Sequence, residues 1–86
     1  MSEIEYQTVV IAGDSYQPDE IVVDPGTEIV WQNDDEESHT VHSDTELFNS
    51  GEIEPGYTWS YVFKEKGMFN YHCDYHSSMA GRVVVE

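Results

Sequence analysis

Short runs of apolar and β-branched residues, separated by polar turns, cover most of the chain. The clearest alternation lies in YTWSYVFK (57–64), where every second residue is aromatic. Successive side chains of a strand point to opposite faces, so these four aromatic residues share one face. Apolar residues at helical spacing are almost absent. The other predicted strands are EYQTVVIA (5–12), EIVVD (20–24), TEIVWQN (27–33), SHTVHS (38–43), MFNYHC (68–73) and GRVVVE (81–86).

Turn signals recur at short intervals between these runs. DPGT (24–27) and EPGY (54–57) each place Pro-Gly at the centre of a tight turn, where glycine supplies a positive φ. Lys66-Gly67 marks a third turn, and NDDEES (33–38) predicts a polar loop whose acidic run is solvated. Seven or eight short strands with regular turns predict an all-β fold, an antiparallel β-sandwich or barrel.

The length of 86 residues predicts a single domain over residues 1–86, without repeats, linkers or a second domain. Eighteen acidic residues against three basic ones give a net charge of −15. Such a surface repels nucleic acid and anionic lipid and attracts a basic protein. The same charge is also typical of general solubility or of adaptation to high salt. No stretch approaches the roughly 18 apolar residues of a membrane span, and the amino terminus does not resemble a signal peptide.

The chain has one cysteine, Cys73, which excludes an internal disulfide. A buried thiol, a reactive thiol or a metal ligand remain as alternatives. Strand phase places Cys73 on the same face of its predicted strand as Phe69 and Tyr71, which we expect to point inward. The neighbouring His72 falls on the opposite face.

The same test distinguishes the two histidines of SHTVHS. His39 is in phase with Val41, an expected core residue, whereas His42 is in phase with Thr40 on the other face. His39 is therefore the better candidate for an inward-facing ligand that meets Cys73.

Beyond Cys73, residues 74–79 contain two serines and no apolar alternation, which predicts a loop. A loop can turn Cys73, His76 and Met79 toward one point, where His39 would add a second imidazole. Two imidazoles, a thiolate and a weak thioether are the donor set of a blue-copper electron-transfer site. A structural zinc site more often uses several cysteines. Taken singly, each residue also has an ordinary alternative, as a buried thiol, a core methionine or a hydrogen-bonded histidine.

Three segments together resemble the cupredoxins, the small blue-copper proteins, over nearly the whole chain. The chain is most similar to the plastocyanin, amicyanin and halocyanin group. The segments are YQPDEIVVDPGTEIVWQNDDEESHTVHSD (16–44), FNSGEIEPGYTWSYVFKEKGMFNYHC (48–73) and CDYHSSMAGRVVVE (73–86).

The resemblance implies one cupredoxin-like domain with a Greek-key β-sandwich and one copper ion near one end. It also implies that His39, Cys73 and His76 are the equatorial metal ligands and Met79 the axial one. The Cys-x2-His-x2-Met spacing is similar to the short loop of amicyanins. Two departures stand out. Tyr75 and Ser77 flank His76 where relatives often have proline, and Thr40 follows His39 where many have asparagine. The Thr40 hydroxyl could bond to the region of Asp74.

The sequence therefore predicts a one-electron carrier, not an enzyme, that cycles Cu(II) and Cu(I). We expect a monomer whose partners are a redox protein donor and acceptor with basic or mixed docking surfaces, and no nucleic acid. We expect it to work outside the cytoplasm, in the periplasm or on the outer face of the membrane, after any signal has been removed. Three alternatives use the same sequence: an extracytoplasmic copper carrier, a cupredoxin that oxidises a small molecule, and a metal-free binding module.

Overall fold

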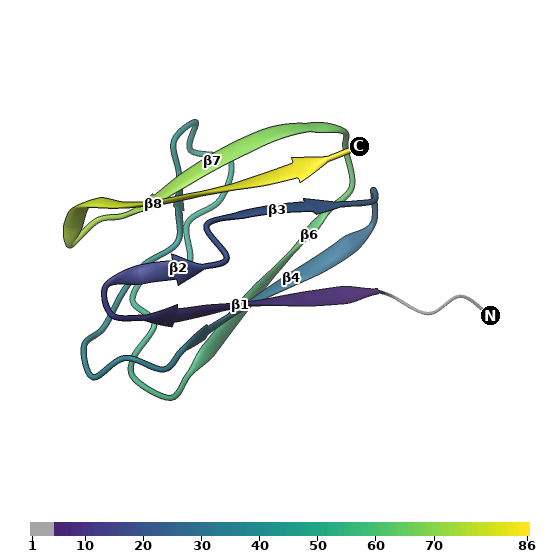
Figure 1. Cartoon of the computed structure of the whole chain (residues 1–86). Coiled ribbons are helices and arrows are strands. Elements are labelled where there is room, and N and C mark those ends of the chain that lie inside the picture. The colour runs from purple at the N-terminus through teal and green to yellow at the C-terminus, as the bar shows by residue number, and fades with distance from the viewer. Residues whose placement is uncertain (1–4) are drawn as a thin grey trace.

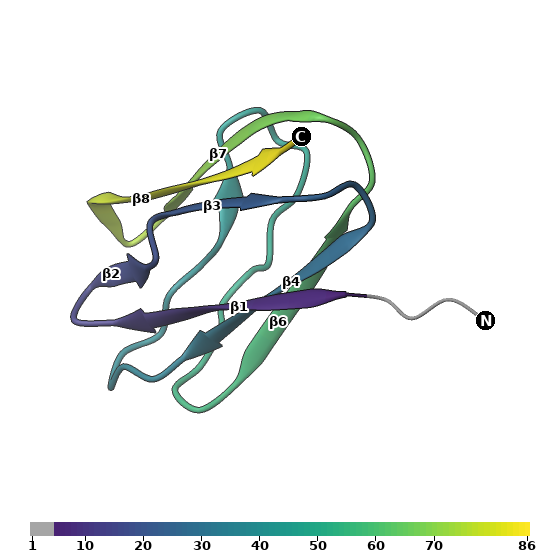
Figure 2. The same ribbon diagram turned by 45° about the vertical axis from the view of Figure 1, so that its right-hand side comes forward.

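Alternating burial explains why the strand segments form two facing sheets. In strand β4 (Thr27–Asn33) every second side chain is buried, and the intervening ones are half-exposed. The computed structural model describes residues 5–86, which form the two layers seen in Figure 1 and, turned by 45°, in Figure 2. The prediction of an all-β sandwich is confirmed.

Each layer contains four strands. The first has the order β2-β1-β4-β6, with β1 (Tyr6–Ala12), β2 (Ser15–Gln17), β4 and β6 (Thr58–Phe63). The second has the order β3-β8-β7-β5, with β3 (Glu20–Val23), β8 (His76–Val85), β7 (Gly67–Cys73) and β5 (His42–Ser43). No helix in the part of the chain that the structure describes could span a bilayer.

The sheets are mixed, which corrects the expectation of purely antiparallel pairing. β1 runs parallel to β4, and β3 runs parallel to β8, whereas the other pairs are antiparallel. Parallel neighbours need a crossover connection. Between β1 and β4, the chain crosses to the second sheet, where β3 pairs with β8, and then returns to the first sheet.

The strands differ from the prediction by more than one residue in three places. β2 was not expected, and only His42–Ser43 of the predicted strand 38–43 forms a named strand. β8 begins at His76 rather than at Gly81, inside the segment predicted as a loop. Its pairing with β7 is irregular there: His72 pairs with Ala80, whereas Cys73 pairs with His76. Residues 77–79 therefore have no partner on β7, which lets this part of β8 bulge.

The core between the layers is built around Trp31, which is fully buried on β4. Its ring packs against four other aromatic rings from both sheets, with centroid separations of 5.4 to 6.4 Å. These rings belong to Phe48, Trp59, Phe63 and Tyr71. Tyr71 thus fixes β7, two residues before Cys73, against the opposite sheet.

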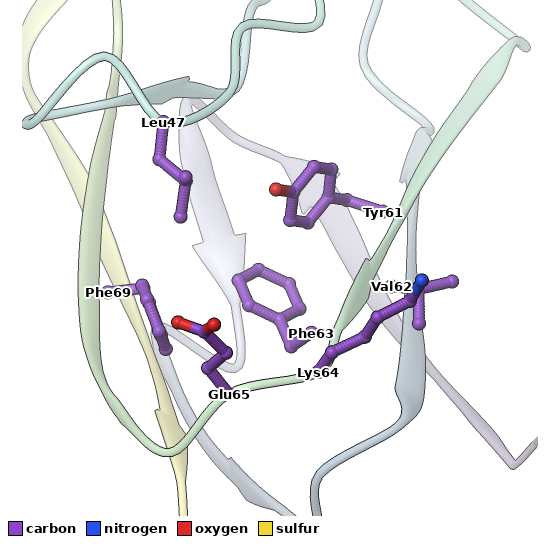
Figure 3. A pocket seen from close by; sticks show the side chains of 7 residues that line it. All are labelled: Leu47, Tyr61, Val62, Phe63, Lys64, Glu65 and Phe69. Atoms are coloured by element: carbon purple, nitrogen blue, oxygen red, sulfur yellow. The ribbon is translucent and has the colours of Figure 1, made fainter.

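The two ends of the sandwich differ in character. The start of β1 and the end of β8 lie at one end, and the β7–β8 turn lies at the other (Figure 1). A cavity of about 500 Å³ opens near the β6–β7 turn, remote from the β7–β8 turn. Figure 3 shows its apolar wall of Leu47, Tyr61, Phe63 and Phe69, with Lys64 and Glu65 at the rim. The chemistry-bearing residues lie at the opposite end.

Gly81 is the tightest packing point between β7 and β8. A Cβ atom at this position would lie 2.4 Å from both Cζ and the hydroxyl oxygen of Tyr71, its cross-strand partner. Tyr71 is buried between Tyr16 and Trp31 and has no room to withdraw. Gly81→Ala should therefore lower the free energy of unfolding by about 1–3 kcal/mol, the usual cost of overpacking, as measured by denaturant titration.

The neighbouring Ala80 provides the matched control, since its side chain is exposed. Ala80→Ser also adds one heavy atom to β8, but it should change the free energy of unfolding by no more than about 0.5 kcal/mol. Equal stability of the two variants would contradict the close approach of Tyr71.

Candidate metal centre

Three metal-ligating side chains converge beside the β7–β8 turn. Cys73 ends β7, His76 begins β8, and His39 lies in the connection between β4 and β5. The Cys73 sulfur lies 3.7 Å from Nδ1 of His39 and 3.7 Å from Nδ1 of His76. We call these three residues the primary cluster. Strand phase correctly placed Cys73 and His39 inward, since each is at most 1% exposed.

The spacing of the primary cluster suits a bound metal ion. In trigonal geometry, a metal–nitrogen bond of about 2.0 Å and a metal–sulfur bond of about 2.3 Å separate nitrogen from sulfur by about 3.7 Å. Both sulfur–nitrogen separations have this length. These two separations therefore already suit an ion bound between the sulfur and the two rings.

Thr40 joins the segment of His39 to the segment of Cys73. Its backbone N–H donates to the Cys73 sulfur at 3.5 Å, and its hydroxyl oxygen accepts the backbone N–H of Asp74 at 2.9 Å. Its carbonyl oxygen also accepts the buried Tyr16 hydroxyl at 2.5 Å. The contact between Thr40 and Asp74 that the sequence suggested is confirmed.

The surroundings of Cys73 favour its thiolate form. Burial by itself raises the pKa of this thiol, but four hydrogen bonds lower it and outweigh burial. The backbone N–H of Thr40, the His76 and His39 rings and the backbone N–H of Tyr75 together bring the pKa from 9.0 to about 7. Since metals bind the thiolate, the site carries a substantial fraction of the binding form at neutral pH.

The ring of His39 is oriented by a carboxylate behind it. Nε2 of His39 lies 2.9 Å from Oδ2 of Asp35. Hydrogen bonds from the Asp14 backbone N–H and from the His39 ring lower the pKa of Asp35. An ionised carboxylate only accepts hydrogen bonds, so Nε2 of His39 carries the proton. Nδ1 is then left with a free lone pair facing Cys73, the usual arrangement of a metal-binding histidine.

Asn33 explains why the acidic loop presents Asp35 to His39. Its buried side-chain amide donates to the carbonyl oxygens of Glu37 at 2.8 Å and Ile53 at 2.9 Å. Its Oδ1 accepts the backbone N–H of Asp35 at 2.9 Å. The His39 backbone is itself paired with Ile53. The buried Asn33 side chain thus helps to fix both Asp35 and, through Ile53, His39.

His76 presents its outer ring edge to solvent. Its side chain is 28% exposed, and Nε2 lies 3.5 Å from Oε1 of Glu37 and 3.8 Å from Oδ1 of Asp14. The hydrogen bond with Cys73 and the charges of Asp14 and Glu37 raise the pKa of His76. The buried face of this ring meets the sulfur, and the outer edge faces carboxylates.

Met79 completes the set of candidate residues and is 2% exposed. It lies in the unpaired stretch of β8, three residues after His76. Its thioether therefore enters the core from the irregular part of the β7–β8 ladder, and not from a free loop as the sequence suggested.

The sequence analysis missed the carboxylates around the two histidine rings. It treated the run 34–37 as solvated, which is correct for Asp34 but wrong for Asp35, whose side chain is 21% exposed and hydrogen-bonded to His39. The separation of four residues between Asp35 and His39 was the available signal. Nothing in the local sequence pointed to Asp14, which approaches from the β1–β2 turn.

The whole chain matches a known family. Residues 2–85 match the model of the cupredoxin-like domain. The chain belongs to the cupredoxin-like family. Membership agrees with the sandwich and with the copper-type donor set of the site.

Amicyanins are prominent among the cupredoxin-like relatives. Amicyanin from Paracoccus denitrificans is 31% identical over 83 residues, which is 91% of this chain and 63% of that protein. A methionine-to-glutamine variant of amicyanin solved with Cu(I) is 29% identical, with a TM-score of 0.89 over 94% of this chain and 82% of that one. A purple cupredoxin from Nitrosopumilus maritimus is 30% identical, with a TM-score of 0.87 over 92% and 98% of the two chains.

Replacing Thr40 by valine tests whether its hydroxyl holds the two segments of this cupredoxin-like site together. Thr40→Val keeps the shape but removes the acceptor of the partly buried Asp74 N–H. We expect the free energy of unfolding to fall by about 1–3 kcal/mol, the cost of leaving such a group unpaired, as measured by urea titration.

Thr58→Val is the control, because Thr58 is exposed on β6. It should change the free energy of unfolding by less than about 0.5 kcal/mol. If Thr40→Val were equally harmless, the hydroxyl would not link the segments.

Proposed function

We propose that the protein carries single electrons by means of one copper ion held by His39, Cys73, His76 and Met79. The observation that supports this is the pair of 3.7 Å separations from the Cys73 sulfur to the two imidazole nitrogens. A bound copper ion would supply the one-electron change between Cu(II) and Cu(I). The thiolate and thioether favour Cu(I), and the imidazoles suit both oxidation states.

The chain's own contribution is to hold one donor arrangement in both redox states. His39 is fixed by its backbone pairing with Ile53 and by the hydrogen bond to Asp35. Cys73 is fixed by the N–H of Thr40 and by the packing of β7. Because these supports lie outside the donor atoms, they persist when an electron arrives, so little structure needs to reorganise.

His76 is the residue best placed to pass the electron to a partner. Its ring meets the Cys73 sulfur on one side and reaches the surface on the other. Tyr75, 54% exposed, adds apolar surface beside it. The carboxylates of Glu37 and Asp14 at the outer ring edge favour partners with basic or mixed docking surfaces. Weak, small interfaces of this kind suit transient redox encounters.

The cellular setting and the partners follow from the same proposal. An amicyanin-like role requires a redox donor and a redox acceptor, which we place outside the cytoplasm. The buried thioether of Met79 argues against an open coordination position for a small substrate, so we propose an electron carrier and not an enzyme. A copper carrier that delivers the ion as cargo is the second candidate, because it uses the same donors.

Adding Cu(II) to the metal-free protein tests the site and the function together. With one equivalent of Cu(II), we expect an intense visible band from the bond between the Cys73 thiolate and Cu(II). The band should fade on chemical reduction and return on oxidation over repeated cycles in the presence of a copper chelator. Absorption spectroscopy with metal analysis after each cycle measures both.

Cys73→Ala should abolish the band, and His42→Gln, which alters a histidine outside the proposed ligands, should leave it. Loss of copper to the chelator within the first cycle would favour the cargo alternative. No visible band in the unaltered protein would refute the copper site itself.

Asp35→Asn tests the support behind His39. The asparagine side chain lacks the negative charge that holds the proton on Nε2 of His39. It can also accept only part of the hydrogen bonds that the Asp35 carboxylate receives. Changes behind a metal-bound histidine typically weaken metal binding by about 10–100-fold. We expect Cu(II) to bind about tenfold more weakly, as measured by competition with a chelator of known affinity.

The adjacent Asp34 offers a control with the same change of charge. Its carboxylate contacts Gln32 and not the primary cluster. Asp34→Asn should therefore leave copper affinity within about twofold. Equal weakening by both variants would show that only general negative charge matters.

A further inference from the structure

A second group of metal-ligating side chains lies on the outer face of β5 and β7. It consists of His42, His72 and Asp74, each of which offers a ligand atom within 4.8 Å of the others. We call it the surface cluster. None of its members belongs to the primary cluster, and the proposed electron transfer does not use them.

Strand register explains why the two histidines meet. His42 and His72 are direct cross-strand partners in the antiparallel pair of β5 and β7. Side chains of such partners stand side by side on the same face of the sheet. Their ring centroids are 4.8 Å apart, with planes inclined by 37°.

Both rings converge on the same oxygen atom. Oδ1 of Asp74 lies 2.8 Å from Nδ1 of His42 and 3.3 Å from Nε2 of His72. An ion bound tetrahedrally to nitrogen at about 2.0 Å and to oxygen at about 2.1 Å separates these atoms by about 3.3 Å. One separation already has this length, and the other needs a shift of about half an ångström, which the exposed Asp74 side chain can supply.

The opposite nitrogen of each ring also faces a carboxylate. Nε2 of His42 lies 2.9 Å from Oε1 of Glu46, and Nδ1 of His72 lies 2.6 Å from Oδ1 of Asp44. Histidines that bind metals typically donate their second N–H to such a carboxylate, which fixes the ring and raises the basicity of the ligand nitrogen. Both rings thus have one nitrogen facing the shared Asp74 carboxylate and the other facing a second carboxylate. A chance gathering of acidic residues would not be expected to produce this arrangement twice.

We propose that His42, His72 and Asp74 form a second metal site, which takes a divalent transition cation of the zinc type. Two imidazoles and one carboxylate suit such ions, and three protein ligands leave room for solvent at an exposed site. Glu46 and Asp44 orient the rings from behind. The cation also offsets the repulsion among three carboxylates crowded around two imidazoles in a chain with a net charge of −15.

Zn²⁺ titration of the full-length Cys73→Ser variant tests the site without the thiolate of the primary cluster. Calorimetry should show one Zn²⁺ per chain. Histidine side-chain NMR should show that stoichiometric Zn²⁺ shifts the ring signals of His42 and His72 and not those of His39 and His76. The same ring shifts should appear in the protein with Cys73 intact and loaded with Cu(I), which is diamagnetic, and this guards against misfolding of the variant.

Two further variants locate the ion. His72→Gln should weaken Zn²⁺ binding at least tenfold, because it replaces an imidazole ligand with an amide. Asp44→Asn, which alters only the carboxylate behind His72, should weaken it about tenfold. Asp24→Asn makes the same change of charge in the turn between β3 and β4 and should leave the affinity within twofold.

The proposal is overturned if His72→Gln retains the affinity, or if Zn²⁺ shifts only the His39 and His76 signals. It is equally overturned if Asp24→Asn weakens binding as much as Asp44→Asn, since the ion would then be held by diffuse charge. These outcomes do not depend on whether the primary cluster binds copper.

Discussion

The hydrogen bonds of Thr40 are the interaction on which the geometry of this end of the sandwich depends. They join a connection that follows β4 to a turn that follows β7, two segments 34 residues apart that no shared strand pairing holds at this point. Without them, His39 would keep its pairing with Ile53 and its hydrogen bond to Asp35, but neither contact involves the segment of Cys73. The bond from the Thr40 N–H also serves chemistry, because the same N–H that positions Cys73 stabilises its thiolate. Structural support and electronic tuning are therefore the same contacts.

The large excess of acid is organised around the few basic groups available. Each of the four histidines has a carboxylate within hydrogen-bonding distance or close to it. The four imidazoles outnumber the three lysines and arginines as side-chain partners for carboxylates. A carboxylate beside one ring nitrogen selects the tautomer with the proton on that nitrogen. The opposite ring nitrogen then keeps its lone pair, which a metal ion can use. An acidic composition that suggests only solubility thus also prepares ring nitrogens for metal binding.

The sequence predicted the features that depend on the alternation of side chains along a strand. It missed the features that depend on packing between distant segments. Strand phase placed Cys73 inward and His72 outward, because a two-residue period survives as long as the strand is regular. It also placed His39 inward, although only an isolated bridge to Ile53 forms there. The same reasoning could not foresee the irregular pairing of Cys73 with His76, which brings Met79 into the core from within β8. Nor could it see the parallel pairs, since direction depends on which sheet the chain visits in between. Asp14 and Asp35 meet their histidines only after the loops have folded, so local patterns did not distinguish them from solvated acids.

The alternation of β7 places the primary and surface clusters on opposite sides of one strand. Consecutive residues of this strand and its turn supply His72 to the outer face, Cys73 to the interior and Asp74 to the outer face again. The backbone of this strand therefore lies between the primary and surface clusters. A cation on the surface cluster would place positive charge beside the residue that follows Cys73, and nearby positive charge favours the reduced form of a metal site that gains an electron. A cation bound at the surface cluster would thus affect the primary cluster through electrostatics alone, with no change of fold.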